Sequence, residues 1–154
     1  MKALTTKELD FVLKNNEVTK NFFIGTFAAC HAPSYKGERV YSFITNTDVH
    51  DLTGTHWNSW FVKDNKIVFF DSFGRSPDDP SFPHEYIDII NGFNIIEYSR
   101  TRLQGQFTST CGFYCIHFIY TLSLGLEIKD FISDYFNNYA VNDSVVLNFV
   151  DSII

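Results

Sequence analysis

The sequence predicts one domain that contains both β-strands and α-helices. Its 154 residues are a usual length for a single domain, and 45% of them are hydrophobic, which is enough for a sizeable core. Short stretches of alternating or β-branched residues predict strands, and stretches with apolar residues three or four positions apart predict helices. We therefore expect residues 1–154 to form a single domain without repeats, linkers or low-complexity segments.

The first third of the chain predicts a short helix followed by strands. Thr5 and Glu8 have the spacing of a capping box, so a helix is expected from this point to about Asn15. The next segments are expected to be a strand or a packed loop (22–27), a loop (32–37), a strand (40–45) and a polar, turn-rich segment (46–54).

A β-hairpin is the clearest local feature. The apolar stretches 56–62 and 67–71 flank the polar turn 63–66. His56 begins the first strand and Asp71 ends the second. Because these two ends of an antiparallel hairpin lie at the same edge of a sheet, the sequence alone predicts that the imidazole and the carboxylate are close together.

The rest of the chain predicts a further strand and several helices. A helix at 84–90 is expected to place Tyr86, Ile87 and Ile90 on one face. The other expected segments are a loop (74–83), a strand (94–99), a buried central helix closed by Gly125 (112–124) and two amphipathic helices (127–136 and 144–153).

Cys111 stands where a loop is expected to turn into the central helix. A thiol at a helix N-terminus feels the positive end of the helix dipole, which favours its thiolate. His56 and Asp71 supply the base and the orienting acid that such a nucleophile needs, so the three residues form the constellation of a cysteine hydrolase. The oxyanion donors would be the backbone N–H of Cys111 and a side-chain amide from Gln104 or Gln106.

Other residues near these motifs have both functional and structural interpretations. Trp57 would bind substrate or shield the catalytic pair from water, or simply pack in the core. Gly112 would allow close backbone approach of a substrate, or only start the helix. A metal site of Cys111, Cys115 and His117 matches no strong zinc pattern, and His117 is expected to be a satisfied core histidine.

Composition narrows the classes of partner. The net charge of −6 disfavours nucleic acid as a direct partner, because nucleic-acid-binding domains usually carry a basic face. Three cysteines leave at least one thiol unpaired, which indicates a reducing compartment or a thiol kept free for use. The N-terminus lacks an apolar signal core, and no segment approaches the roughly 20 apolar residues of a membrane span. We expect a soluble, intracellular protein with no membrane partner.

Four motifs follow one another along the chain: FIGTF (23–27), GTHW (54–57), FDSFG (70–74), and LQG (103–105) followed by CGFYC (111–115). They resemble those of the adenovirus protease (adenain) family of cysteine peptidases, in the clan shared with proteases of ubiquitin-like modifiers. The similarity covers about residues 20–125, and the order His, acid, Gln, Cys is also that of the family.

The resemblance implies a role for each matched residue. His56 would be the base and Asp71 the acid that orients it. Cys111 would be the nucleophile and Gln104 the oxyanion donor, whereas Gln106 does not match the family motif. The resemblance also implies an α+β fold, in which a mixed central β-sheet is flanked by helices and the nucleophile lies at the N-terminus of a buried central helix.

The same resemblance implies a polypeptide substrate cleaved next to small residues, typically Gly. The expected role is to process viral or virus-like capsid or core precursors during maturation, in the virion or at the site of virus assembly. Alternatives within the clan are a ubiquitin-like-modifier protease, an acetyl transferase, and a catalytically inactive binding module with the same fold.

The chain also departs from the family. Its acid is Asp71, whereas adenain has Glu and the modifier proteases have Asp. Adenain is activated by DNA and by a viral peptide held through a disulfide. No cysteine lies between Cys30 and Cys111, so we expect no disulfide-linked cofactor, although a non-covalent activating peptide stays open. No other cofactor and no metal are expected.

Overall fold

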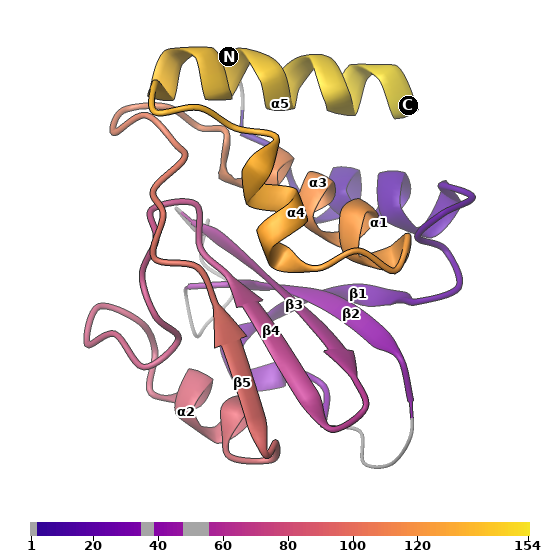
Figure 1. The fold of residues 1–154 in the computed structure, drawn as a ribbon. Coiled ribbons are helices and arrows are strands. Elements are labelled where there is room, and N and C mark those ends of the chain that lie inside the picture. Colours follow the sequence, from indigo (N-terminus) through magenta and orange to yellow (C-terminus); the bar gives the residue numbers. More distant parts are fainter. Residues whose placement is uncertain (1–2, 35–38, 48–55) are drawn as a thin grey trace.

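The centre of the protein is a five-stranded mixed sheet (Figure 1). The structure is a computed structural model that describes residues 3–34, 39–47 and 56–154. The strands follow in chain order across the sheet: β1 (Phe23–Ala28), β2 (Tyr41–Asn46), β3 (Trp57–Lys63), β4 (Lys66–Phe70) and β5 (Ile95–Tyr98). The outer pairs β1–β2 and β4–β5 are parallel, and the inner pairs are antiparallel. This confirms the expected α+β class.

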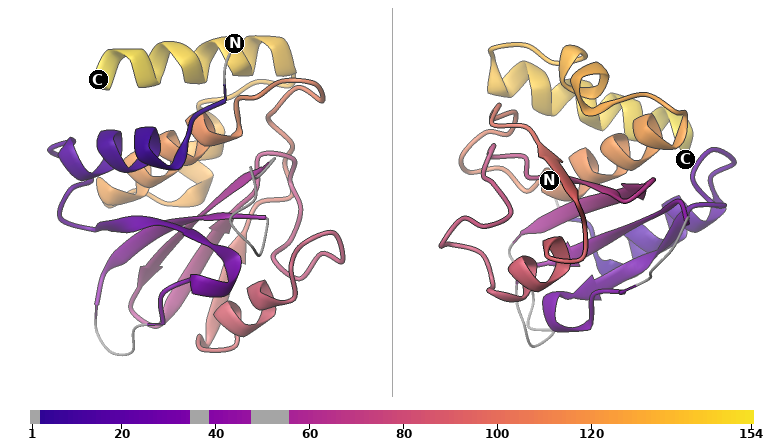
Figure 2. Two further views of the ribbon diagram at one scale, coloured as in Figure 1. Left: turned by 180° about the vertical axis from the view of Figure 1, so that it is seen from behind. Right: turned by 60° about the horizontal axis from the view of Figure 1, so that its bottom comes forward.

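Helices cover both faces of the sheet (Figures 1 and 2). They are α1 (Thr6–Asn15), α2 (Glu85–Ile90), α3 (Cys111–Ser123), α4 (Ile128–Ser133) and α5 (Tyr139–Ile153), with a short 3₁₀ turn η1 (Ala29–His31). α3 packs directly on β3 and also contacts α1, α4 and α5, whereas α2 lies on the opposite side beside η1. Within the described ranges, no helix combines the length and the apolar character that a membrane span requires.

Alternate side chains of β3 lie in two separate hydrophobic cores, one on each face of the sheet. Trp57 and Phe61 belong to the core under α3, and Trp60 and Val62 belong to the core on the α2 side. Because both faces of this strand are buried, its sequence is a nearly continuous apolar run.

The β3–β4 hairpin turns through two residues. Asp64 and Asn65 have φ values of 53° and 62°, the left-handed conformation that a type I′ turn requires, and Asn and Asp adopt it readily. Lys63 and Lys66 already pair across the ladder, so the turn is shorter than the predicted segment 63–66.

Most of the predicted elements are present. Thr5 and Glu8 form the capping box, with Glu8 N–H donating to Thr5 Oγ1 (3.2 Å) and Thr5 N–H to Glu8 Oε1 (3.0 Å). The segment 22–27, left open between strand and loop, is largely strand β1. Gly125 follows α3 with a φ of 91°. Residues 35–37 of the predicted loop and 48–54 of the predicted polar segment lie outside the described residues.

One predicted helix face was wrong. Tyr86 and Ile90 of α2 are buried, but Ile87 is 43% exposed. Residues four positions apart lie on one side of a helix, whereas a neighbouring residue is rotated by about 100°. Ile87 therefore points away from the face that Tyr86 and Ile90 turn toward the sheet.

The last two helices also differ from their predicted bounds. α4 ends at Ser133 rather than 136, and α5 begins at Tyr139 rather than 144. Asn138 caps α5, because its side chain accepts the Val141 N–H (3.1 Å). The early start was missed because Asn142 and Asp143 place polar side chains on the buried side of the first turns.

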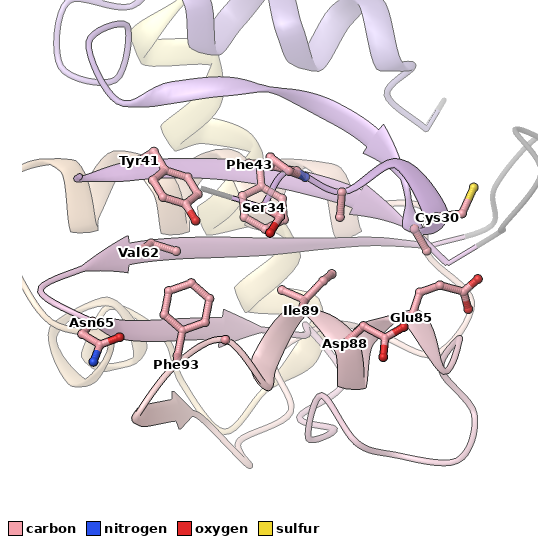
Figure 3. A pocket seen from close by; sticks show the side chains of 14 residues that line it. Cys30, Ser34, Tyr41, Phe43, Val62, Asn65, Glu85, Asp88, Ile89 and Phe93 are labelled. Atoms are coloured by element: carbon pink, nitrogen blue, oxygen red, sulfur yellow. The ribbon is translucent and has the colours of Figure 1, made fainter. Parts of the chain in front are cut away.

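A cavity of about 580 Å³ opens on the α2 side of the sheet (Figure 3). Tyr41 and Phe43 of β2, Val62 of β3 and Ile89 of α2 contribute to its wall. None of the predicted catalytic residues lines it, so it is separate from the candidate site described next.

Candidate active site

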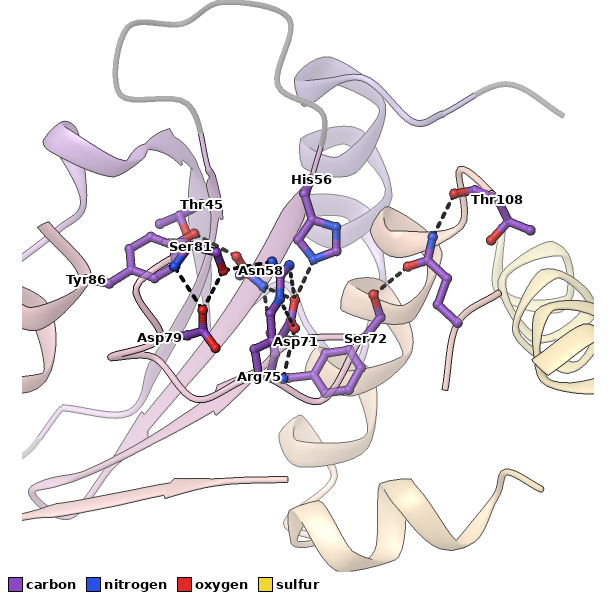
Figure 4. A network of polar contacts seen from close by, with 12 residues as sticks. Thr45, His56, Asn58, Asp71, Ser72, Arg75, Asp79, Ser81, Tyr86 and Thr108 are labelled. Carbon is purple, nitrogen blue, oxygen red and sulfur yellow. Dashed lines mark hydrogen bonds and ion pairs between the residues drawn. The ribbon is translucent and has the colours of Figure 1, made fainter. Parts of the chain in front are cut away.

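The hairpin brings His56 and Asp71 into direct contact, as its sequence predicts (Figure 4). His56 immediately precedes β3 and Asp71 immediately follows β4. The distance between His56 Nε2 and Asp71 Oδ1 is 2.5 Å. Both side chains are buried, so their interaction is poorly screened by solvent.

Cys111 is the second neighbour of the His56 ring. Burial alone would lower the pKa of His56, but hydrogen bonds with Asp71 and with Cys111 outweigh burial and raise the pKa to about 9. The thiol therefore lies within hydrogen-bonding reach of the imidazole. Because Asp71 occupies Nε2, Nδ1 is the ring nitrogen left for the sulfur. A ring protonated at neutral pH in this position can pair with a thiolate.

Asp71 also accepts hydrogen bonds from residues other than His56. Asn58 Nδ2 donates to Oδ1 (2.9 Å), and Arg75 donates its backbone N–H (3.1 Å) and Nε (2.9 Å) to Oδ2. Burial by itself raises the pKa of Asp71, but hydrogen bonds from His56 and Arg75 lower it to about 2. The carboxylate is thus an anion at neutral pH. Sequence reasoning missed both Asn58 and Arg75.

A chain of hydrogen bonds supports the Asn58 amide from behind (Figure 4). Tyr86 donates its hydroxyl to Asn58 Oδ1 (2.8 Å) and pairs with Thr45 Oγ1 (2.8 Å). Trp60 Nε1 donates to the same Thr45 oxygen (2.9 Å). Because Asn58 Oδ1 accepts from Tyr86, its Nδ2 must face Asp71. Hydrogen bonds therefore connect the site to residues on the α2 side of the sheet.

Gln104 has a fixed amide orientation. Ser72 Oγ donates to Gln104 Oε1 (2.5 Å), and Gln104 Nε2 donates to the Thr108 carbonyl (2.9 Å). A carbonyl can only accept, so the amide cannot flip without losing this bond. One N–H of the buried Gln104 amide remains available, whereas Gln106 is exposed. The oxyanion role of Gln104 stays a prediction.

The N-terminus of α3 has no side-chain cap, and its first residue is Cys111 itself. Thr110 stands at the cap position, but its Oγ1 donates to Asp143 Oδ1 (3.0 Å), to which Tyr114 also donates (2.6 Å). The first N–H groups of a helix have no intrahelical acceptor. Those of α3 are therefore available to stabilise negative charge on a sulfur or an oxyanion.

Trp57 and Gly112 pack against each other. Trp57 is buried and its Nε1 donates to the Leu4 carbonyl (3.1 Å). A Cβ on Gly112 would lie 3.3 Å from Trp57 Cδ1 and from Leu4 Cβ. The lack of a side chain at Gly112 thus lets α3 come close to Trp57. The predicted contact of these two residues with substrate stays a prediction.

His117 is a satisfied core histidine, as predicted. Its Nδ1 pairs with the Tyr135 hydroxyl, and its ring lies 4.1 Å from the Phe149 ring. Burial lowers the pKa of His117 to about 4, so the ring is neutral despite the nearby Asp134 carboxylate. Cys115 is fully buried, and burial raises its pKa. Over the described ranges, no group of three or more His, Cys, Asp or Glu residues is suited to hold a metal ion.

Comparison with known proteins finds similarity to two viral proteases. No family model matches it. A protease of Human adenovirus A serotype 12 is 25% identical over 115 residues, which covers 66% of the chain and 56% of the relative. The chain is related to the adenovirus proteases. It spans just over half the length of that relative.

A solved structure shares the fold. The crystal structure of an ASFV protease superposes with a TM-score of 0.59 at 20% identity, covering 94% of the chain and 66% of that protein. The fold of the ASFV protease is thus shared over nearly the whole chain.

Proposed function

We propose that the chain is a cysteine peptidase with Cys111 as the nucleophile. The observation that carries the proposal is the position of the His56 ring, which pairs with Asp71 through Nε2 and lies within hydrogen-bonding reach of Cys111. The thiol also begins a helix whose first N–H groups have no side-chain cap. A nucleophile, a base and an orienting acid in contact form the arrangement needed for acyl transfer.

The first half of the reaction forms a thioester. The Cys111 sulfur attacks the carbonyl carbon of the scissile bond, and the carbonyl electrons move onto its oxygen. This oxyanion accepts hydrogen bonds from the Cys111 backbone N–H and the remaining Nε2–H of Gln104. When the tetrahedral intermediate collapses, the carbon–nitrogen bond breaks and the leaving amine takes the Nδ1 proton of His56.

The second half releases the acid. Neutral His56 accepts a proton from water through Nδ1, and the resulting hydroxide adds to the thioester carbon. The carbon–sulfur bond then breaks, which restores the thiolate and the imidazolium. Throughout, Asp71 accepts the Nε2–H, keeps the ring in the required tautomer and stabilises its positive charge.

The substrate would be a polypeptide cut next to small residues, typically Gly, and the role would be processing of viral capsid or core precursors at the site of virus assembly. The family motifs and the viral origin of the related protease support this assignment. No disulfide-linked cofactor or metal takes part in the proposed reaction, and a non-covalent activating peptide is compatible with it.

Labelling of the thiol tests the proposal. A Gly-Gly peptide carrying a vinyl sulfone should add once to the folded wild type, as measured by intact-mass spectrometry. Cys111→Ala should lose both labelling and peptide cleavage, whereas Cys30→Ala, which removes an exposed cysteine, should retain both. A folded wild type that resists the probe, or a Cys111→Ala variant that still cleaves, would refute the peptidase assignment. Modifier-fusion substrates cleaved in preference to short peptides would support the deconjugating alternative.

A further inference from the structure

Three contacts orient the guanidinium group of Arg102. Its Nε donates to the Gln104 carbonyl (2.9 Å). Its guanidinium carbon lies over the Tyr139 ring, 4.4 Å from the centroid, and over the Phe73 ring, 5.3 Å from the centroid. Cation–π contacts of this kind hold a guanidinium in place without neutralising its charge.

These contacts place Arg102 one aromatic ring away from the candidate active site. The Phe73 ring stacks on the His56 ring, with centroids 5.2 Å apart and planes inclined by 28°. Only one aromatic ring therefore separates the guanidinium from the proposed base. On its other side, Arg102 touches the backbone of the residue that supplies the proposed oxyanion donor.

The terminal nitrogens of Arg102 have no hydrogen-bond partner among the described residues. Within the described part of the chain, no carboxylate pairs with this residue, and Nε is the nitrogen that donates a hydrogen bond. Arg75 is a useful contrast, because its Nε and Nη2 donate to Asp71 and its Nη1 donates to Ser81. Arg102 is half-buried, so part of its side chain remains accessible to solvent while the contacts above orient the guanidinium.

We propose that Arg102 is a specificity-determining residue that binds a carboxylate of the polypeptide substrate, from an Asp or Glu side chain close to the cleaved bond. This inference rests on the proposed peptidase function. The two terminal nitrogens match the two oxygens of a carboxylate in a bidentate pair. The net charge of −6 repels acidic peptides at long range. The preference must therefore arise from local contact and depend on the position of the acidic residue.

A positional scan tests the inference. The substrates are C-terminally amidated octapeptides with a central Gly-Gly, with alanine elsewhere, in which Asp, Asn or Lys replaces each alanine in turn. At one or two positions, kcat/KM should be about tenfold higher for Asp than for Asn, and lowest for Lys. Arg102→Gln should abolish this difference, and Arg102→Glu should invert it in favour of Lys. Such an inversion would not follow from a purely structural role.

Arg100→Gln is the matched control. Arg100 lies two residues away and also contacts an aromatic ring, but its partner is Tyr98. This variant should keep the wild-type preference. Equal kcat/KM for Asp, Asn and Lys at every position, or a preference that survives in Arg102→Gln, would overturn the inference and leave the peptidase function intact. A preference seen only with unamidated peptides would also overturn it, because a terminal carboxylate would then be the ligand.

Binding to Cys111→Ala separates this inference from the proposed function. Fluorescence anisotropy with the labelled Asp and Asn peptides needs no turnover. If the wild type cleaves none of the peptides but Cys111→Ala binds the Asp peptide about tenfold more tightly through Arg102, the peptidase assignment fails and the carboxylate site stands. Equal binding of both peptides would refute the site.

Discussion

His56 and Asp71 keep their charges over the whole neutral range. The pKa of the imidazole is raised to about 9 and that of the carboxylate is lowered to about 2, so each group stabilises the charged form of the other. As pH rises through 9, the imidazolium is lost and the Cys111 sulfur loses the positive charge beside it. The plot of the Cys111 alkylation rate against pH should therefore show a transition near pH 9.

Asp71→Asn should move this alkaline transition to lower pH. Without the anion, burial lowers the pKa of His56 with less opposition. The kcat should fall by about a hundredfold or more, because an amide no longer selects the required tautomer. The measurement is the rate of Cys111 alkylation and of peptide cleavage between pH 6 and 10. Asp151→Asn, at an exposed position of α5, is the control, and an unchanged transition in Asp71→Asn would contradict the assignment.

Gln104→Ala should separate labelling from turnover. The amide would act mainly on the oxyanion, so kcat should fall by about 10²–10³-fold while the probe still labels Cys111. Ser72→Ala should give a smaller loss, because Ser72 only fixes the orientation of the amide. Gln106→Ala, at an exposed position, should leave kcat unchanged. Wild-type kcat in Gln104→Ala would remove this residue from the mechanism.

The individual site residues differ in how far the sequence predicts them. His56 and Asp71 follow from hairpin geometry, because both belong to one local unit. Cys111 was proposed from its place at the start of a predicted helix, but several elements separate it from the hairpin, so its contact with His56 could not be derived from local geometry. The choice of Gln104 over Gln106 needed the family resemblance. Asn58 and Arg75 were missed because their contacts with Asp71 depend on the strand register and on the path of the loop after β4.

Among the secondary-structure elements, the first turns of α5 hold the loop that leads to Cys111. Asn142 is fully buried, and its Nδ2 donates to the carbonyls of Leu103 (3.2 Å) and Phe136 (2.8 Å). Its Oδ1 accepts the Phe136 N–H (2.7 Å). α5 therefore ties the segment before Gln104 to the segment that follows α4.

Asn142→Ala should destabilise the protein by about 2–3 kcal/mol, since it leaves buried backbone groups without partners. Urea denaturation should report this loss as a lower midpoint with an unchanged slope. Asn148→Ala makes the same change at an exposed position of the same helix and should cost less than about 0.5 kcal/mol. Equal midpoints for the two variants would show that the α5 contacts are not needed for stability.

Sequence patterns predicted elements best where one physical signal dominates. The capping box located the start of α1, and the alternation of β3 and β4 located the hairpin. The bounds of α5 were wrong because hydrophobic periodicity cannot recognise a buried Asn or Asp that is satisfied by hydrogen bonds. Hydrophobic periodicity was also insufficient for Ile87, because its exposure depends on which side of the short helix α2 faces the sheet.

The molecule as a whole contains two cores, one on each face of the sheet. His117 is buried in the core under α3 and should make the free energy of unfolding depend on pH. The folded pKa of His117 is about 4, below its value of about 6.5 in an unfolded chain. The unfolded state thus binds the proton more readily. Stability should fall by about 3 kcal/mol as pH decreases from 6.5 to 4.

His117→Gln should flatten this dependence. Urea midpoints at pH 7 and pH 4.5 should differ less for the variant than for the wild type. His84→Gln, at an exposed position before α2, should retain the wild-type difference. Asp71 does not contribute to this difference between pH 7 and pH 4.5. Because its pKa is lowered in the folded state, its contribution to stability is lost only below about pH 4. An equal difference between the two midpoints in His117→Gln and in the wild type would show that His117 is not buried as a neutral ring, because the contribution of His56 is common to both proteins.

The arrangement of the strands separates two stages in the assembly of the site. His56 and Asp71 are 15 residues apart and meet through a local turn, which costs little loop-closure entropy. Cys111 joins them only when α3 docks on β3, a contact between distant parts of the polypeptide. A nascent chain that has formed the hairpin but not this docking would hold an unactivated sulfur. In the proposed peptidase, activity would therefore begin only after α3 has docked on the sheet.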